Sequence, residues 1–308
     1  MPTLERLREG PHPVVAVVSQ PDRPRGRGRR LSPSPVAQVA LDAGLPLLRP
    51  ERVGTPETAE ALRRFEPDLG VVVAFGQFLP KRIRELPRLG YLINGHASLL
   101  PRHRGAAPIA HAILAGDAET GVSVMRVERE MDAGPVAVMR STPIGPDETA
   151  GELTERLAVL TAEAIGDALG AIGEDRVDWR PQDDAAATLA PKLGSEDAWL
   201  DFREPAQQLA RRVRALAPRP GARTRLEGET LRILAASALA GAVDDPPGTV
   251  RRTGDPPLRI ATGAGWLAPR VLQRAGGRPI AVEELQRGRA IPDGVRLGDP
   301  PDAATIDA

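Results

Sequence analysis

Several residue types are absent or scarce in this sequence, and each absence narrows what the protein can be. The chain has no cysteine, which excludes disulfide bonds, thiolate nucleophiles and cysteine-ligated metals. Aromatic residues make up only 3% of the 308 residues, so hydrophobic cores must be built from Leu, Val, Ile and Ala. Acidic and basic residues balance at 41 each, and the zero net charge gives no global signal for a nucleic acid partner.

The sequence also lacks the signatures of membrane insertion and secretion. No apolar run approaches the roughly 20 residues that are needed to cross a bilayer. The N-terminus does not show the charged-then-apolar pattern of a signal peptide. We therefore expect a cytoplasmic protein that does not contact a membrane.

The first half of the sequence predicts a doubly wound, mostly parallel α/β sheet, because short apolar runs alternate with amphipathic segments. We expect strands at 14–18, 45–48, 69–74, 91–93, 121–127 and 135–139, and helices at 35–43, 56–65, 107–114 and 148–172. The run 69–74 is almost wholly apolar, as is typical of a parallel strand that is buried on both faces. Ligands of such sheets bind at the carboxyl ends of strands, and the strand 91–93 leads directly to Asn94.

The second half of the sequence has a different pattern. Periodicity is lost over 176–195, which we interpret as a linker between a first domain at 1–175 and a second domain at 196–308. A helix is expected at 206–216, followed by short strands at 224–226, 231–234, 248–251, 258–262 and 265–272 and a helical turn at 283–286. Closely spaced short strands with regular turns favour a small β-barrel.

The residues most capable of chemistry lie between Asn94 and Asp132. The run N-G-H places a carboxamide two residues before the imidazole of His96, and Asp132 follows 36 positions later within M-D-A-G-P-V. Attack on a carbonyl carbon requires such a set, because negative charge builds on the carbonyl oxygen while a proton leaves the nucleophile. Taken singly, each residue also fits an ordinary turn or helix cap.

Other kinds of catalytic site are disfavoured. The four histidines, at positions 12, 96, 103 and 111, lack the helical spacing of a zinc site, and we expect His103 and His111 to lie at the surface. Ser98 is not part of a G-x-S-x-G elbow, and neither a Walker A motif nor a dinucleotide-binding glycine pattern is present. We expect no metal.

A basic segment at 23–30 has two interpretations. Five arginines occur within these eight residues, interleaved with glycine, in P-D-R-P-R-G-R-G-R-R. The segment is either a solvated basic loop or a phosphate-binding loop, and composition favours neither.

Taken in order, these motifs resemble the methionyl-tRNA formyltransferases of the folate-dependent formyltransferase superfamily, over nearly the whole chain. The resemblance is carried by S-Q-P-D-R-P-R-G-R-G-R-R-L-S-P-S-P-V, V-V-V-A-F-G-Q-F-L-P, N-x-H-x-S-L-L-P-x-x-R-G-A-A-P, G-D-A-E-T-G-V-S-V-M and M-D-A-G-P-V, and later by A-P-K-L, L-D-F and R-G-R-A-I-P-D-G. The N-x-H…S-L-L-P…D core is common to the superfamily, so it indicates the chemistry rather than the acceptor.

The resemblance implies transfer of a formyl group from 10-formyltetrahydrofolate to the α-amine of methionyl initiator tRNA by a monomeric enzyme with a Rossmann-like domain and an OB-like barrel. Asn94, His96 and Asp132 match the catalytic positions of the family. The positions that match the folate site are Ser98, Leu99, Leu100, Pro101, Phe78 and Leu79. Those that match the tRNA-contacting loop are Arg25, Arg27, Arg29 and Arg30.

One departure and two alternatives follow from the comparison. The family begins with a buried strand and a G-T-P-E-F-A turn that precede the helix starting here at Pro2, and without that strand we expect exposed apolar strand edges. An N-formyltransferase that acts on a nucleotide-linked amino sugar would keep the same catalytic residues and the same donor. An inactive, truncated RNA-binding remnant is the alternative from a different class. A glycinamide ribonucleotide transformylase is disfavoured, since its chain usually lacks the second domain.

Overall fold

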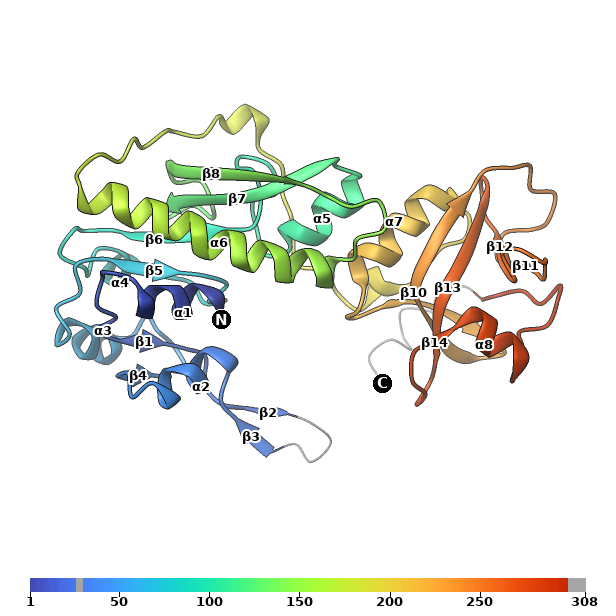
Figure 1. The fold of residues 1–308 in the computed structure, drawn as a ribbon, viewed down its shortest axis with the longest axis horizontal. Helices are drawn as coiled ribbons and strands as arrows, with labels where there is room; N and C mark the ends of the chain where they lie inside the picture. The colour runs from blue at the N-terminus through green and yellow to red at the C-terminus, as the bar shows by residue number, and fades with distance from the viewer. Residues whose placement is uncertain (26–29, 299–308) are drawn as a thin grey trace. The chain divides into compact units, whose positions relative to one another are not determined.

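The computed structural model describes residues 1–25 and 30–298, and the chain divides into two compact units (Figure 1). The first unit comprises Met1–Pro108, Thr120–Thr142 and Glu155–Pro191, and the second comprises Ile109–Glu119, Pro143–Thr154 and Lys192–Ala308. The second unit therefore includes two short segments from the first half of the sequence. None of the helices in the described ranges is long and apolar enough to cross a membrane.

The first unit has mixed α/β architecture, and two of its sheets contain parallel strands. In one sheet β1 (Val17–Val18) pairs in parallel with β4 (Leu47–Leu48). The other sheet has the order β5 (Gly70–Val72), β6 (Leu92–His96), β7 (Glu119–Arg126) and β8 (Val136–Pro143), with β5 and β6 parallel and β6 and β7 antiparallel.

The sequence predicts one doubly wound, mostly parallel sheet. In the described residues the parallel pairs are divided between two sheets, β1 with β4 and β5 with β6, and β7 is antiparallel to β6. The expected complete burial of β5 is also wrong, since its three residues are only half-buried. Val15 and Val73, which flank these two strands, are each 40% exposed.

The helices of the first unit begin where local caps place them. α2 (Pro35–Asp42) begins after Ser34, whose hydroxyl accepts a hydrogen bond from the amide of Ala37 at 3.0 Å. α3 (Pro56–Arg63) begins after Thr55 in the same way, which confirms the predicted cap. The remaining helices of this unit are α1 (Pro2–Glu9), α4 (Lys81–Arg84) and α6 (Ala150–Gly173), whose first turn belongs to the second unit.

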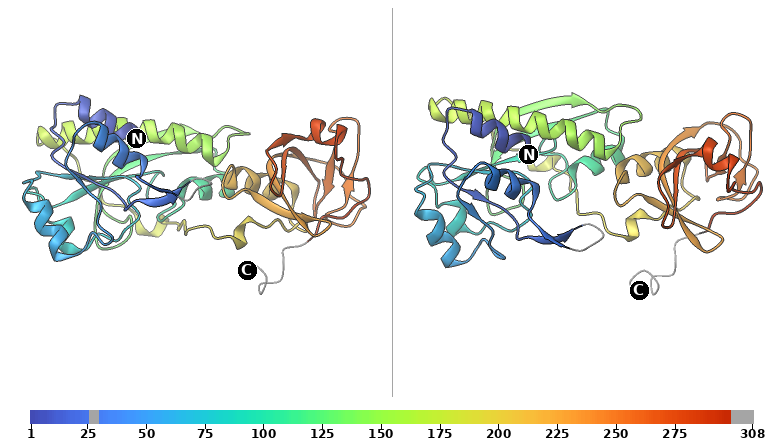
Figure 2. Two further views of the ribbon diagram at one scale, coloured as in Figure 1. Left: turned by 90° about the horizontal axis from the view of Figure 1, so that it is seen from below. Right: turned by 60° about the horizontal axis from the view of Figure 1, so that its bottom comes forward.

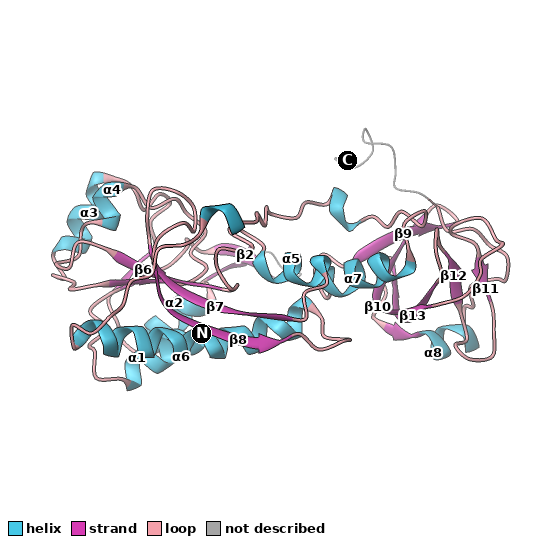
Figure 3. Ribbon diagram, turned by 90° about the horizontal axis from the view of Figure 1, so that it is seen from above, coloured by secondary structure: helices cyan, strands magenta, loops and turns pink. Residues whose placement is uncertain are grey.

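Helix α6 covers one face of the four-stranded sheet, and α1 lies beside it (Figures 2 and 3). The contact with α1 is close, because a Cβ atom placed on Gly166 would lie 3.0 Å from Nε of Arg6. Helices α3 and α4 lie on the other side of the sheet from α6 (Figure 3). One face of β6 is therefore covered by α6, and the polar residues of that strand must use the other face.

The basic segment begins and ends in strands rather than forming a loop throughout. β2 (Arg23–Arg25) pairs in antiparallel fashion with β3 (Arg30–Ser32), so that Arg25 is opposite Arg30. Arg27 and Arg29 lie outside the described residues. The sequence does not predict these strands because they lack alternating apolar residues. They form by hydrogen bonding to each other.

The second unit is built on an antiparallel sheet with three helices (Figure 1). The strand order is β11 (Val250–Arg251), β12 (Arg259–Ala261), β13 (Trp266–Arg274), β10 (Glu229–Leu239) and β9 (Ala222–Leu226), and β14 (Ile280–Ala281) also pairs with β13. The helices are α5 (Pro108–Ala115), α7 (Ala206–Leu216) and α8 (Val282–Arg287). The bounds of α7 are those that the sequence predicts.

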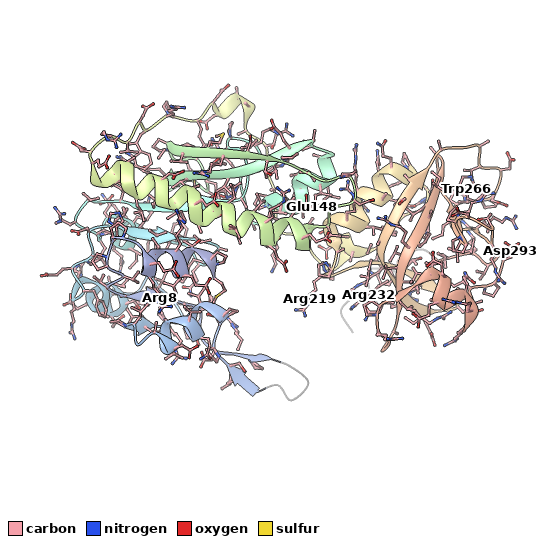
Figure 4. All side chains as sticks on the ribbon, in the orientation of Figure 1. Arg8, Glu148, Arg219, Arg232, Trp266 and Asp293 are labelled. Atoms are coloured by element: carbon pink, nitrogen blue, oxygen red, sulfur yellow. The ribbon has the colours of Figure 1, made fainter. Side chains whose placement is uncertain are left out.

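A segment near the end of the described chain contacts both edge strands of this sheet. The amide of Gly298 donates to the carbonyl of Arg225 on β9 at 2.8 Å, and the amide of Leu297 donates to the carbonyl of Gly248, just before β11, at 2.9 Å. Inside the sheet, Leu231, Ile233, Leu267 and other apolar residues form one buried cluster. Trp266 on β13 (Figure 4) carries the guanidinium of Arg259 4.1 Å from its ring centre.

Candidate active site

Strand β6 presents Asn94 and His96 on the same face, because alternate residues of a strand point the same way. Gly95 between them faces α6, where an added Cβ atom would lie 2.6 Å from Cγ2 of Thr161 and 3.1 Å from Cδ1 of Ile165. The sequence ends this strand at Ile93, and that boundary is wrong. Pairing of β6 with β7 extends the strand to His96, so the two polar residues lie within the sheet and not beyond it.

The imidazole of His96 is buried and lies between two oxygen acceptors. Its Nε2 atom lies 2.9 Å from the carbonyl oxygen of His103, and its Nδ1 atom lies 3.5 Å from Oδ2 of Asp132. A carbonyl oxygen only accepts, so Nε2 carries the proton of that hydrogen bond. His103 is itself 6% exposed, which corrects the expectation that it lies at the surface. The residue type of His103 does not indicate this contact, because its backbone carbonyl and not its side chain accepts from His96.

Asp132 is held in a turn with an unusual backbone conformation. Its φ angle is 53°, in the left-handed region that residues with a side chain seldom occupy. Oδ2 of the same residue accepts a hydrogen bond from the amide of Gly105 at 2.9 Å. The carboxylate is therefore fixed at both its backbone and its side chain, and it faces His96 from a defined direction.

Asn94 differs from these two residues in having an uncommitted side chain. It is half-buried, and its carboxamide makes no hydrogen bond with any residue in the ranges 1–25 and 30–298. Its N–H groups are therefore available to a bound molecule. Together the three residues offer a free amide donor, a fixed imidazole and a carboxylate that touches the imidazole.

Ser123 on β7 forms hydrogen bonds with the backbone of the S-L-L-P segment, residues 98–101. Ser123, which is fully buried, donates to the carbonyl of Ser98 at 2.8 Å and accepts from the amide of Leu100 at 3.1 Å. The Ser98 hydroxyl is also fully buried and donates to the carbonyl of Arg102 at 2.6 Å. Ser98 thus shapes the backbone of the segment, and Leu100 packs into a small cluster with Met125.

Two residues that are predicted to bind the folate, Phe78 and Leu79, differ in how far they are exposed to solvent. Phe78 is 72% exposed, whereas Leu79 packs against the cluster that contains Ile83 and Leu92.

The described residues include no group of three or more His, Asp or Glu side chains that could hold a metal ion.

Part of the segment that the sequence predicts as a linker, 176–195, forms hydrogen bonds with the residues around His96. We call residues 179–190 the strap. The Nε2 atom of Gln182 donates to the carbonyls of Asp132 and Gly134 at 2.9 and 2.7 Å, while its Oε1 atom accepts from Nε of Arg104 at 3.0 Å. Thr188 Oγ1 accepts from the amide of His103 at 2.8 Å. Sequence reasoning missed these residues, since long-range hydrogen bonds leave no local pattern.

An unbonded amide and a buried imidazole on one face of β6 are compatible with an enzyme that promotes attack on a carbonyl carbon. The chain belongs to the formyl transferase family. Residues 2–169 match the formyl transferase model, and residues 192–290 match the model of the formyl transferase C-terminal domain.

Two relatives that are similar to this chain over nearly their whole length are both methionyl-tRNA formyltransferases. A methionyl-tRNA formyltransferase of Halorhodospira halophila is 47% identical over 294 residues, which covers 96% of this chain and 94% of that relative. Another, from Methylococcus capsulatus, is 46% identical over 97% of this chain and 96% of its own length.

Solved structures share the fold at much lower identity. An N-formyltransferase from Helicobacter canadensis, in complex with folinic acid and dTDP-3-aminofucose, has a TM-score of 0.63 at 14% identity and covers 87% of this chain and 94% of that chain. HypX from Aquifex aeolicus, in complex with tetrahydrofolic acid, has a TM-score of 0.58 at 19% identity and covers 80% of this chain and 43% of that chain. These likenesses concern the fold alone.

Proposed function

We propose that the protein transfers a formyl group from 10-formyltetrahydrofolate to the α-amine of methionyl initiator tRNA. The observation that carries the chemistry is His96, fixed between His103 and Asp132 on the strand face that also presents Asn94. The observation that favours the acceptor is similarity at 46–47% identity over nearly the full length to two methionyl-tRNA formyltransferases.

We assign Asn94, His96 and Asp132 as the catalytic residues. The Asn94 carboxamide donates to the formyl oxygen as the amine attacks the formyl carbon. The bond between that carbon and the folate nitrogen then breaks, and the proton that leaves the amine goes to that nitrogen. Since Nε2 of His96 is committed to the His103 carbonyl, Nδ1 is the nitrogen that can exchange a proton with the reacting groups. The 3.5 Å separation of Nδ1 from Asp132 exceeds that of an ideal hydrogen bond and leaves this contact exchangeable. Asp132 orients the ring from the side of Nδ1.

The folate donor fits the residues around this face. It supplies the electrophilic formyl carbon. We assign its binding to Phe78, Leu79 and the segment formed by Ser98, Leu99, Leu100 and Pro101. The exposed ring of Phe78 and the uncommitted carboxamide of Asn94 support this assignment, because an aromatic surface and a polar donor suit a fused heterocycle that carries a formyl group. Ser98 contributes through backbone shape, since its hydroxyl is already bonded to Arg102.

We assign tRNA contacts to Arg25, Arg27, Arg29 and Arg30 in and between β2 and β3. The second unit is proposed to be an OB-like barrel, which the contacts of Leu297 and Gly298 with the opposite edges of its sheet support. We further propose a catalytic domain at 1–175, a linker at 176–195, a barrel domain at 196–308, and a cytoplasmic monomer.

A formyl-transfer assay with purified protein, 10-formyltetrahydrofolate and methionyl initiator tRNA tests the function. We expect formyl-methionyl-tRNA as product, and we expect His96→Ala to lower turnover by on the order of 10²–10³ with the fold retained. A dTDP-linked amino sugar serves as the competing acceptor. Formylation of the sugar and not of the tRNA would instead support the sugar N-formyltransferase, and no transfer to either would support an inactive RNA-binding protein.

A further inference from the structure

The strap makes polar contacts with the backbone on both sides of His96, and the reaction proposed above gives it no role. On the Asp132 side, one carboxamide uses its whole hydrogen-bonding capacity. Gln182 donates to two carbonyls of the turn at 132–134 and accepts from Nε and Nη2 of Arg104 at 3.0 and 2.8 Å. Because Arg104 can only donate, the orientation of the Gln182 amide is determined by this network.

The turn that Gln182 binds needs such support. Asp132 adopts φ of 53°, a left-handed conformation that aspartate tolerates better than most residues but that is still less favourable than the common backbone angles. Gln182 binds the carbonyl of this residue directly. Without the two hydrogen bonds the turn can relax toward common backbone angles, and the carboxylate would then move away from Nδ1 of His96.

On the opposite side of His96, Thr188 holds the other acceptor. Its hydroxyl accepts from the amide of His103, and its carbonyl accepts from the amide of Arg104, both at 2.8 Å. The carbonyl of the same His103 residue faces Nε2 of His96. His103 also has a positive φ, of 59°, so this peptide too is held in an uncommon conformation.

The strap itself is anchored to the sheet at its first residues. The guanidinium of Arg126 on β7 lies 4.2 Å from the ring centre of Tyr91 and 4.4 Å from that of Trp179, where the strap begins. Arg180 and Val136 exchange two backbone hydrogen bonds, of 2.8 and 2.9 Å. A fixed starting point of this kind lets Gln182 impose its geometry on the turn.

We propose that Gln182 and Thr188 are positioning residues that set the two acceptors of the His96 imidazole. This inference rests on the proposed function, because it concerns the same imidazole. It assigns a role in catalysis to a segment whose sequence indicates only a connection between domains.

The first test is Gln182→Glu, which keeps the size and the acceptor for Arg104 but removes both N–H donors. We expect kcat to fall by about 10²-fold with each KM changed by less than about threefold, because a displaced catalytic group impairs the transition state and not binding. Arg180→Ala is the control, since that side chain is 77% exposed and pairs with Asp178, while its backbone hydrogen bonds to Val136 are kept. Equal kcat for Gln182→Glu and Arg180→Ala would overturn the proposal for Gln182.

The second test uses a matched pair at Thr188. Thr188→Val keeps the shape and removes the hydroxyl acceptor, whereas Thr188→Ser keeps the acceptor. We expect kcat to fall about tenfold or more in the valine variant and to be restored in the serine variant. Equal loss in both variants would show that packing, and not the hydrogen bond, explains the effect.

The third test separates positioning from a general effect on stability. If Gln182 acts through Asp132, Gln182→Glu should lower kcat by less than about threefold in the Asp132→Asn background, since coupled residues are not additive. Full additivity would overturn the coupling. Ring-nitrogen NMR shifts of His96, compared at fixed pH, give a readout without turnover. We expect Gln182→Glu to move them and Arg180→Ala to leave them unchanged.

These measurements also separate the inference from the proposed function. Wild-type protein that transfers no formyl group would refute the function, while the NMR comparison would still decide whether Gln182 positions His96. Active wild-type protein with an unimpaired Gln182→Glu variant and unmoved His96 shifts would refute only the positioning role.

Discussion

Gly95 separates the two polar residues of β6, and its missing side chain is what allows α6 to lie against the strand. The space beside it is filled by Thr161, whose hydroxyl is bonded to the carbonyl of Leu157, and by the fully buried Ile165. Neither side chain can easily move away, since one is tied by a hydrogen bond and the other is packed in the core. The glycine thus fixes the strand on which Asn94 and His96 stand.

Gly95→Ala is therefore expected to destabilise the protein. An added Cβ atom 2.6 Å from Cγ2 of Thr161 forces the strand and helix apart, at a cost of about 1–3 kcal/mol. The control is Gly170→Ala on the same helix, where no atom lies within 4 Å of the new Cβ atom and alanine should stabilise the helix by roughly 0.5–1 kcal/mol. Urea unfolding of both variants measures the effects, and a neutral Gly95→Ala variant would contradict this account.

At this scale the sequence predicts residues that act through their side chains and misses those that act through their backbone. Asn94, His96 and Asp132 can be proposed from the sequence because amide, imidazole and carboxylate groups have recognisable chemistry. The structure brings His96 and Asp132 into contact. His103 contributes a carbonyl oxygen, which every residue has, and the donors of Gln182 come from 50 positions away from Asp132. Neither contribution leaves a signal in a single sequence.

Among the elements, α6 begins with a reciprocal capping box. The amide of Thr149 donates to Oε2 of Glu152 at 2.9 Å, and the amide of Glu152 donates to the hydroxyl of Thr149 at 3.3 Å. The Thr149 hydroxyl also donates to Oε2 of Glu152, at 2.8 Å, and the backbone and side-chain hydrogen bonds from Thr149 to the carboxylate lower the pKa of Glu152 below its ordinary value of 4.5. A carboxyl group whose pKa is lowered by folding stabilises the folded state above its unfolded pKa, and that contribution is lost as the pH falls through the folded value.

Glu152→Gln should therefore show a stability defect that depends on pH. Glutamine keeps the capping geometry but loses the charge at the positive end of the helix dipole, so we expect a loss of about 0.3–1 kcal/mol at pH 7. The difference from wild type should shrink as the pH falls below 4.5, the ordinary value, and should be lost below the lowered pKa of the folded protein. Urea unfolding of both proteins at pH 7 and at a pH below 4.5 measures this difference. Glu155→Gln, one turn further along the exposed face, is the charge-matched control, and an equal defect there would refute the box.

Helices are predicted from this sequence more accurately than strands. α2, α3 and α7 carry their own caps or amphipathic patterns, and their observed bounds lie within two residues of the expected ones. Strand ends depend on partners that are remote in sequence. β6 continues to His96 because β7 pairs with it, and β10 reaches Leu239 because β13 pairs with it over that length. A pattern within one strand does not contain that information.

For the whole molecule, a net charge of zero constrains how RNA can be bound. With 41 basic and 41 acidic residues, the overall charge cannot attract a polyanion, so affinity must come from a local array of cations. Many arginines of the described ranges are paired with carboxylates, including Arg63 with Glu60 and Arg88 with Asp68. The segment 23–30 contains five arginines and no acidic residue. This local excess of positive charge is what the proposed assignment of the segment to phosphate binding requires.

Replacing Arg25, Arg27, Arg29 and Arg30 with alanine should thus weaken tRNA binding and also reduce its dependence on salt. Each phosphate contact that is lost lowers the slope of log K against log salt by about 1, so the four changes should lower it by up to about 4. The control replaces four exposed, acid-paired arginines and changes the net charge equally. These are Arg63, Arg88, Arg176 and Arg203. If binding measured across a salt series responds equally in both variants, net charge and not the arginine segment governs association with RNA.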